Sequence, residues 1–162
     1  MSLLLVAVLS FAQLHAAVPS AEWPAYGRDG AGTRFSPLRE IHRDNVQNLK
    51  VAWTIQTGAA PETSPAAKNA AFEATPLMVD GALYLSTPFN HVLCLDPRTG
   101  AVRWRFDPKI NLAGRYSEVT SRGVSTWKGG SEPRRIFLGT IDARLIALDA
   151  ATGQPCRDFG QG

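Results

Sequence analysis

Three features of the sequence predict an all-β fold assembled from repeated antiparallel sheets. The chain is rich in turn-forming residues, with 14 glycines and 11 prolines among 162 residues, which is too many for a helical bundle. Its hydrophobic content of 44% is too high for a disordered protein. The third feature is an internal repeat. The net charge is only +3, without a basic run, so composition gives no support for a nucleic-acid partner.

The repeat has a period of 53 residues. Residues 82–106 (ALYLSTPFNHVLCLDPRTGAVRWRF) align without gaps on residues 135–159 (RIFLGTIDARLIALDAATGQPCRDF). The identical pairs include Thr87 and Thr140, Leu95 and Leu148, Asp96 and Asp149, Thr99 and Thr152, Gly100 and Gly153, and Phe106 and Phe159. A weaker, earlier copy is the segment AWTIQTG at residues 52–58. A repeat of this length is typical of a β-propeller blade.

Each copy predicts short antiparallel strands. Apolar residues alternate with their neighbours in the first run of each copy, and a second apolar run follows (HVLCLD and RLIALD). In the LDxxTG connector, Asp and Thr can cap backbone N–H groups and Gly supplies a positive φ, so a hairpin is expected. The sequence therefore predicts about two to three four-stranded blades. Because one blade cannot bury both faces, blades must stack, and Trp104 is expected to pack between them. Arg157 occupies the equivalent position in the second copy.

The N-terminus resembles an export signal. Residues 1–18 contain an apolar stretch of about a dozen residues followed by Ala16 and Ala17, which suits a secretory signal peptide better than a membrane span. No Lys or Arg precedes the apolar run, and a buried strand or helix is the alternative. Residues 19–162 are then the exported part. Cys94 and Cys156 are either a disulfide or buried free thiols.

Several motifs in order resemble the pyrroloquinoline quinone (PQQ) dehydrogenases, which are eight-bladed propellers. LDPRTGAVRW resembles the blade motif of that family, and residues 23–53, FEATPLMVDGALYLSTP and SRGVSTW resemble its N-terminal segments. The resemblance extends from Trp23 to Gly162 and is closest to the membrane-associated glucose, sugar and polyol dehydrogenases. At a period of 53 residues, eight blades need about 420 residues, so this chain is expected to be an N-terminal part of such a propeller.

The resemblance also implies cofactor-binding residues. Glu73 matches a glutamate that reaches the cofactor, and Arg122 matches an arginine placed against the quinone oxygens, where a guanidinium can stabilise negative charge. The alcohol dehydrogenases of the family have adjacent cysteines where this chain has Tyr116 and Ser117, which argues against the methanol or ethanol branch. Glucose enzymes have a histidine where this chain has Glu118, which is a third candidate cofactor contact and puts glucose in doubt as the substrate.

The implied reaction is the oxidation of a sugar or alcohol hydroxyl in the periplasm, with PQQ as the hydride acceptor and Ca²⁺ as a Lewis acid. Electrons would leave to a respiratory quinone or cytochrome, with peripheral membrane association as a further expectation. The base aspartate and the main Ca²⁺ ligands are expected beyond residue 162, so no catalytic or metal residue is assigned here and the isolated chain is expected to be inactive. The alternative function is a non-catalytic propeller of PQQ-like repeats that acts as a protein-binding scaffold in the cell envelope.

Overall fold

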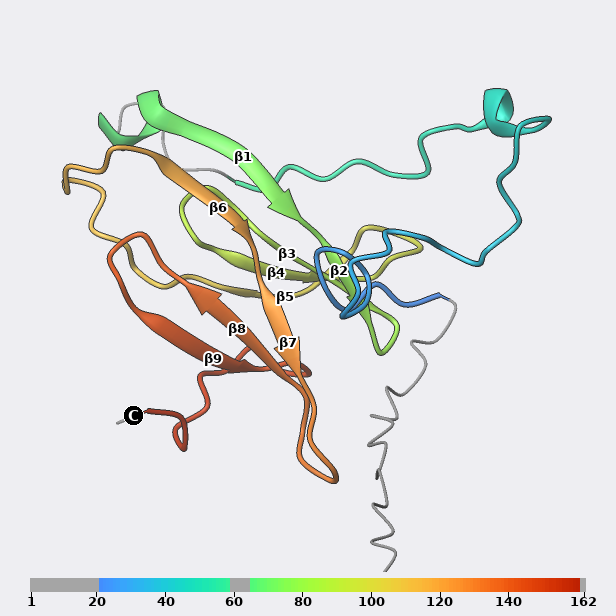
Figure 1. The fold of residues 1–162 in the computed structure, drawn as a ribbon. Helices are drawn as coiled ribbons and strands as arrows, with labels where there is room; N and C mark the ends of the chain where they lie inside the picture. Colours follow the sequence, from blue (N-terminus) through green and yellow to red (C-terminus); the bar gives the residue numbers. More distant parts are fainter. Residues whose placement is uncertain (1–20, 59–64, 161–162) are drawn as a thin grey trace, which may run out of the picture.

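A computed structural model describes residues 21–58 and 65–160 of the chain. These residues form two antiparallel sheets side by side, joined by a pair of parallel strands, and a long N-terminal arm that extends away from them (Figure 1). No α-helix occurs in the described ranges, which contain two short 3₁₀ helices, η1 (Val46–Asn48) and η2 (Pro65–Asn69). The predicted all-β class is therefore confirmed. None of the described helices is long and apolar enough to cross a membrane.

The first blade has the four antiparallel strands that the sequence predicts. They are β2 (Leu77–Val79), β3 (Ala82–Ser86), β4 (Val92–Leu95) and β5 (Val102–Phe106), and they are hydrogen-bonded in that order. The tight β2–β3 turn places Asp80 and Gly81 at positive φ values of 47° and 68°. Consecutive left-handed residues suit a two-residue hairpin turn, because their twist matches that of the flanking strands.

The second blade has three strands in the described part of the chain. They are β7 (Ser125–Trp127), β8 (Arg135–Gly139) and β9 (Leu145–Asp149). The residues that correspond to the fourth strand form only an isolated bridge, in which Pro155 pairs with Leu148. Proline has no N–H to donate, and turns follow directly, so this edge is not extended into a strand.

The LDxxTG connectors adopt one geometry in both copies. The Asp96 carboxylate accepts hydrogen bonds from the amides of Arg98 and Thr99, and the Asp149 carboxylate accepts one from the amide of Thr152. Gly100 and Gly153 both have a φ of +72°, a conformation that glycine adopts without steric cost. Asp96 and Asp149 are thus the turn residues that the repeat predicts.

Trp104 lies between the blades, as predicted. Its Nε1 donates to the carbonyl of Ala150 at 3.0 Å, and its ring covers Gly153 so closely that an added Cβ would lie 2.5 Å from Cε3. Trp53 repeats this contact one unit earlier: its Nε1 donates to the Pro97 carbonyl at 3.0 Å and its ring covers Gly100. In both cases the flat indole thus packs directly on a glycine of the turn, which has no side chain to obstruct the ring.

The core lies mainly between the two blades. Side chains from β2–β4, from β8 and β9, and from two residues next to strands form one buried cluster, namely Leu77, Val79, Ala82, Tyr84, Val92, Cys94, Val124, Ile136, Leu138, Leu148 and Ala150. On the other face of the first blade, Leu85, Leu93 and Leu95 are buried, with Trp53 and Ile55 of the N-terminal arm packed against them. The first blade is therefore covered on both faces, which is the stacking that the repeat requires.

The rest of the N-terminal arm carries exposed apolar side chains. Residues 51–55, which correspond to β5 in the repeat, form no strand. Phe35, Ile41 and Val51 are exposed to 65%, 59% and 82%. The predicted signal segment 1–18 lies outside the described residues. Cys94 and Cys156 are both free thiols, and Cys94 is buried, which raises the pKa of its thiol.

Candidate functional site

The parallel strands β1 (Ala70–Thr75) and β6 (Val119–Gly123) bring together two of the three predicted site residues. Each strand leads directly into the first strand of its blade, β1 through Pro76 into β2 and β6 through Val124 into β7. Arg122 Nη1 lies 2.7 Å from Glu73 Oε2 and forms an ion pair with it. The side chains are 77% and 40% exposed, so the pair remains open to a ligand.

A bulge in the pairing of these strands places the two side chains next to each other. Phe72 pairs with Ser121 and Thr75 pairs with Gly123, so two residues of β1 oppose the single residue Arg122 of β6. Bulges of this kind bend a strand and turn a side chain to a new direction, and they are frequent beside functional sites.

The backbone is constrained at both neighbours of Arg122 in the strand, Ser121 and Gly123. Ser121 is 7% exposed, and its Oγ lies 2.7 Å from the Oγ of Ser86 on β3, which ties β6 to the first blade. Gly123 has a φ of +133°, which side chains rarely tolerate, and an added Cβ would lie 3.0 Å from the carbonyl oxygen of Thr75. Because side chains alternate along a strand, inward Ser121 directs Arg122 outward.

Glu118 does not join this pair. It is exposed and immediately precedes β6, four residues before Arg122, which corresponds to about 13 Å along an extended strand. No hydrogen bond or ion pair of its side chain occurs with the described residues. Tyr116, two residues before it, contributes to the loop instead: it packs against buried Phe89 and Val119, and its hydroxyl donates to the Asn111 carbonyl at 3.0 Å.

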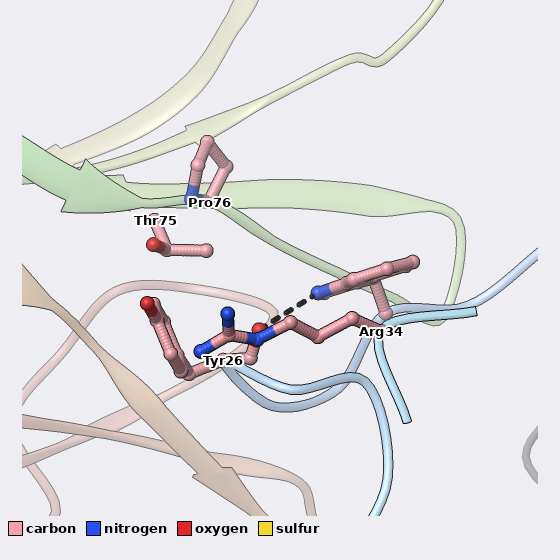
Figure 2. A pocket seen from close by; sticks show the side chains of 5 residues that line it. Tyr26, Arg34, Thr75 and Pro76 are labelled. Carbon is pink, nitrogen blue, oxygen red and sulfur yellow. Dashed lines mark hydrogen bonds between the residues drawn. The ribbon is translucent and has the colours of Figure 1, made fainter. Parts of the chain in front are cut away.

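An open pocket lies where β1 passes into β2. It has a volume of about 510 Å³ and is lined by Trp23, Tyr26, Arg34, Thr75 and Pro76. Figure 2 shows Arg34 lying across the Tyr26 ring, with the guanidinium carbon 4.7 Å from the ring centroid. The dashed line marks the bond from Trp23 Nε1 to the Tyr26 carbonyl. Thr75 is two residues from Glu73, so this pocket adjoins the strand that carries the ion pair.

The site offers a cation and an anion side by side on a partly exposed surface. A guanidinium presents a planar set of N–H donors that fits carboxylates and other anionic oxygens, and a carboxylate accepts hydrogen bonds from hydroxyl or amide groups. Within the described ranges, no group of three or more His, Cys, Asp or Glu side chains could hold a metal ion.

Comparisons with known proteins now place the chain. Residues 23–162 match the family described as "PQQ: Glucose/ethanol/alcohol dehydrogenase, beta-propeller domain". The chain belongs to this family. The match begins at Trp23, where the sequence motifs also begin, and it confirms both the resemblance and the partial propeller.

Relatives within the PQQ family include dehydrogenases that are named for different substrates. Quinoprotein glucose dehydrogenase A of Acinetobacter calcoaceticus is 35% identical over 93% of the chain, and the glycerol dehydrogenase large subunit of Gluconobacter oxydans (strain 621H) is 38% identical over 93%. The crystal structure of quinohemoprotein alcohol dehydrogenase from Comamonas testosteroni is similar, with a TM-score of 0.68 and 36% identity over 87% of the chain. The chain spans only about a fifth of these proteins, 21%, 21% and 20% of their respective lengths.

Sequence reasoning did not identify the residues that support the pair. The Ser86–Ser121 contact joins residues 35 positions apart, and serines have no distinctive pattern in either strand. The bulge likewise depends on the register between two strands that are distant in sequence. The identity of residue 123 as glycine was a sequence signal for the unusual backbone conformation directly after Arg122.

Proposed function

We propose that this chain forms the N-terminal part of a PQQ-dependent dehydrogenase propeller that oxidises a sugar or alcohol hydroxyl, with Glu73 and Arg122 in contact with the cofactor. Membership of the PQQ family supports the dehydrogenase over the scaffold alternative. The observation that carries the residue assignment is the ion pair, with Arg122 Nη1 2.7 Å from Glu73 Oε2 on the two strands that join the blades.

The chemistry of this pair fits PQQ, which accepts a hydride from the substrate when it is bound. The Arg122 guanidinium would donate hydrogen bonds to anionic oxygens of the cofactor and stabilise negative charge there, because it is a cation with a planar set of N–H donors. The Glu73 carboxylate would orient the guanidinium and accept hydrogen bonds from the ligand. Glu118 immediately precedes the strand that carries Arg122 and does not join the ion pair, so we assign it to a more distant part of the cofactor or substrate site.

Finer features of the activity belong to the same proposal. Tyr116 and Ser117 in place of adjacent cysteines favour a sugar or polyol substrate over methanol or ethanol, and Glu118 in place of a histidine disfavours glucose. We further propose that Ca²⁺ is bound mainly by residues outside this chain. The remaining features are a periplasmic location, peripheral membrane association, electron transfer to a respiratory quinone or cytochrome, and inactivity of the isolated chain.

Equilibrium dialysis of the 162-residue chain against PQQ tests the residue assignment. We expect weak binding that decreases by about tenfold in Arg122→Gln, because a charge-assisted hydrogen bond is lost. A matched control is Arg98→Gln, since Arg98 is an exposed arginine in a turn. Equal PQQ retention by the wild-type chain and Arg122→Gln would refute the role of Arg122. Dye reduction above background with glucose, glycerol or ethanol would contradict the proposed inactivity.

A further inference from the structure

A second hollow lies on the N-terminal loop, apart from the Glu73–Arg122 pair. It has a volume of about 570 Å³, is open to solvent, and is lined by the loop around Arg28 and by the β7–β8 hairpin of the second blade. Three cations line it: Arg28 from the loop, and Lys128 and Arg134 from the hairpin. The exposed ring of Trp127 forms part of its wall.

Arg28 is the unusual member of this set. Arg28 is only 8% exposed, yet its Nε has no hydrogen-bond partner among the described residues. No carboxylate among the described residues forms an ion pair with its guanidinium. Burying a polar atom of a charged side chain without a partner is unfavourable, so buried arginines are normally paired. The side chain lines the hollow, and an anion there would supply the missing partner.

The acidic side chains nearby are already engaged. The Asp29 carboxylate accepts hydrogen bonds from the amides of Ala31 and Thr33 and from the Thr33 hydroxyl, and these bonds lower its pKa. Asp80 pairs with Arg134, whose Nε lies 2.7 Å from Asp80 Oδ2. Arg28 and the exposed Lys128 therefore remain as cations with no bonded carboxylate in the described part of the chain.

The loop is built to keep Arg28 in this position. Its amide donates to the Ala25 carbonyl at 2.9 Å, and the Arg34 amide donates to the Gly27 carbonyl at 3.0 Å, which closes the loop on itself. At the crossing point, a Cβ added to Gly27 would lie 2.7 Å from the Gly32 Cα. Arg28 itself has a φ of +73°, so the loop holds a non-glycine residue in a left-handed conformation.

We propose that this hollow binds a small oxyanion, a free carboxylate or phosphate, through Arg28 with Lys128 at the rim. A guanidinium binds two oxygens of such a group through parallel N–H donors, and burial strengthens the interaction. This site is separate from the proposed PQQ contact, and its test does not depend on enzymatic activity.

The test is isothermal titration calorimetry of the 162-residue chain with inorganic phosphate and, separately, with acetate at low ionic strength. We expect saturable binding of at least one anion, with a dissociation constant on the order of 1 mM. Arg28→Met should weaken this binding by about tenfold or more, and Lys128→Met by about threefold. The matched control Arg39→Met removes an exposed arginine of the same arm and should leave the affinity unchanged. The preferred anion identifies the class of ligand.

Thermal unfolding gives a second readout that does not rely on heats of binding. A ligand that binds only the folded chain raises its melting temperature, so phosphate or acetate should stabilise the wild-type chain and Arg39→Met but not Arg28→Met. Without added anion, Arg28→Met should be at least as stable as the wild-type chain, because it removes an unpaired buried charge. The proposal is overturned if neither anion binds saturably, or if Arg28→Met binds as tightly as the wild-type chain.

Discussion

On the face that the first blade turns toward the second, three polar side chains form hydrogen bonds across the boundary. The Tyr84 hydroxyl and Trp104 Nε1 both donate to the Ala150 carbonyl at 3.0 Å, and the Asn90 Oδ1 accepts from the Ile141 amide at 2.9 Å. At the equivalent positions, 53 residues later, the second blade has Phe137, Ala143 and Arg157. Phe137 and Ala143 have no polar side-chain atom, so they cannot form the corresponding hydrogen bonds. Arg157 could donate one only through its guanidinium, not through an indole N–H.

The two blades nevertheless share their hairpin geometry. Asn90 and Ala143 both have left-handed backbones, with φ values of 60° and 65°, and the amide of each donates to the carbonyl of the threonine three residues earlier. The turn conformation is therefore set by local sequence, whereas the contacts between blades are set by side chains that the second blade does not preserve. Blade formation and blade docking are thus separable properties, and substitutions can test each one.

The largest expected effect comes from removing the docking indole. Trp104→Ala should lower the free energy of unfolding by about 4 kcal/mol, because a large ring and its hydrogen bond are lost from the blade boundary. Arg157→Ala, at the equivalent position of the second blade, should change it by less than about 0.5 kcal/mol, since Arg157 is exposed. Urea unfolding followed by circular dichroism measures both. Equal losses would show that the boundary contact is unimportant.

The role of Trp104 could be predicted from the sequence because it depends on the repeat itself. Asp96, Thr99 and Gly100 act on neighbouring amides within their own turn, so local sequence was sufficient to predict the hairpins. The missing fourth strand at Pro155 was not predicted, because the aligned positions of the first copy form β5.

The candidate site was less accessible to sequence reasoning. Glu73 and Arg122 were chosen through the family resemblance, and nothing local indicates that residues 49 positions apart form an ion pair. Their contact depends on the parallel register of β1 and β6 and on its bulge. The burial of Arg28 could not be predicted either, because it depends on how the N-terminal loop packs against the β7–β8 hairpin.

A glycine substitution under the indole tests the same boundary from the other side. Gly153→Ala should lower the free energy of unfolding by about 3 kcal/mol, because the new Cβ meets the Trp104 ring at 2.5 Å and the backbone φ is +72°. Gly81→Ala is the matched control, since Gly81 has a φ of +68° but no atom within 4 Å of an added Cβ. Its loss should be about 1 kcal/mol, so the difference isolates the ring contact.

The third pair of variants exchanges the hairpin residues of the two blades. Asn90→Ala should destabilise the chain by about 2 kcal/mol, because it removes the acceptor of the Ile141 amide and leaves a left-handed alanine. Ala143→Asn should stabilise it by about 0.5 kcal/mol, since asparagine tolerates a positive φ better than alanine. Thermal and urea unfolding measure whether each substitution raises or lowers the free energy of unfolding. A destabilised Ala143→Asn would mean that its side chain clashes in the second blade.

The smallest expected effect is a pH dependence confined to the first blade, at the position where it has His91 and the second blade has Arg144. Arg105 Nη2 lies 2.7 Å from His91 Nδ1, and burial together with the positive charge of Arg105 lowers the pKa of His91 from 6.5. The folded state therefore favours the neutral ring, and its contribution to stability is complete above pH 6.5 and is lost as the pH falls through the lowered pKa.

Urea unfolding at about pH 7.5 and about pH 5.5 measures this contribution. The midpoint of the wild-type chain should fall at the lower pH, and that of His91→Gln should fall by less, because glutamine does not titrate. Paired aspartates do not interfere in this window: the neighbouring Arg103 lowers the pKa of Asp96 to about 2. The other two histidines of the sequence are present in both proteins, so the comparison isolates His91. An equal fall in both proteins would assign the pH dependence to groups other than His91, whose ring contacts Arg105 through Nδ1 and Asp107 through Nε2.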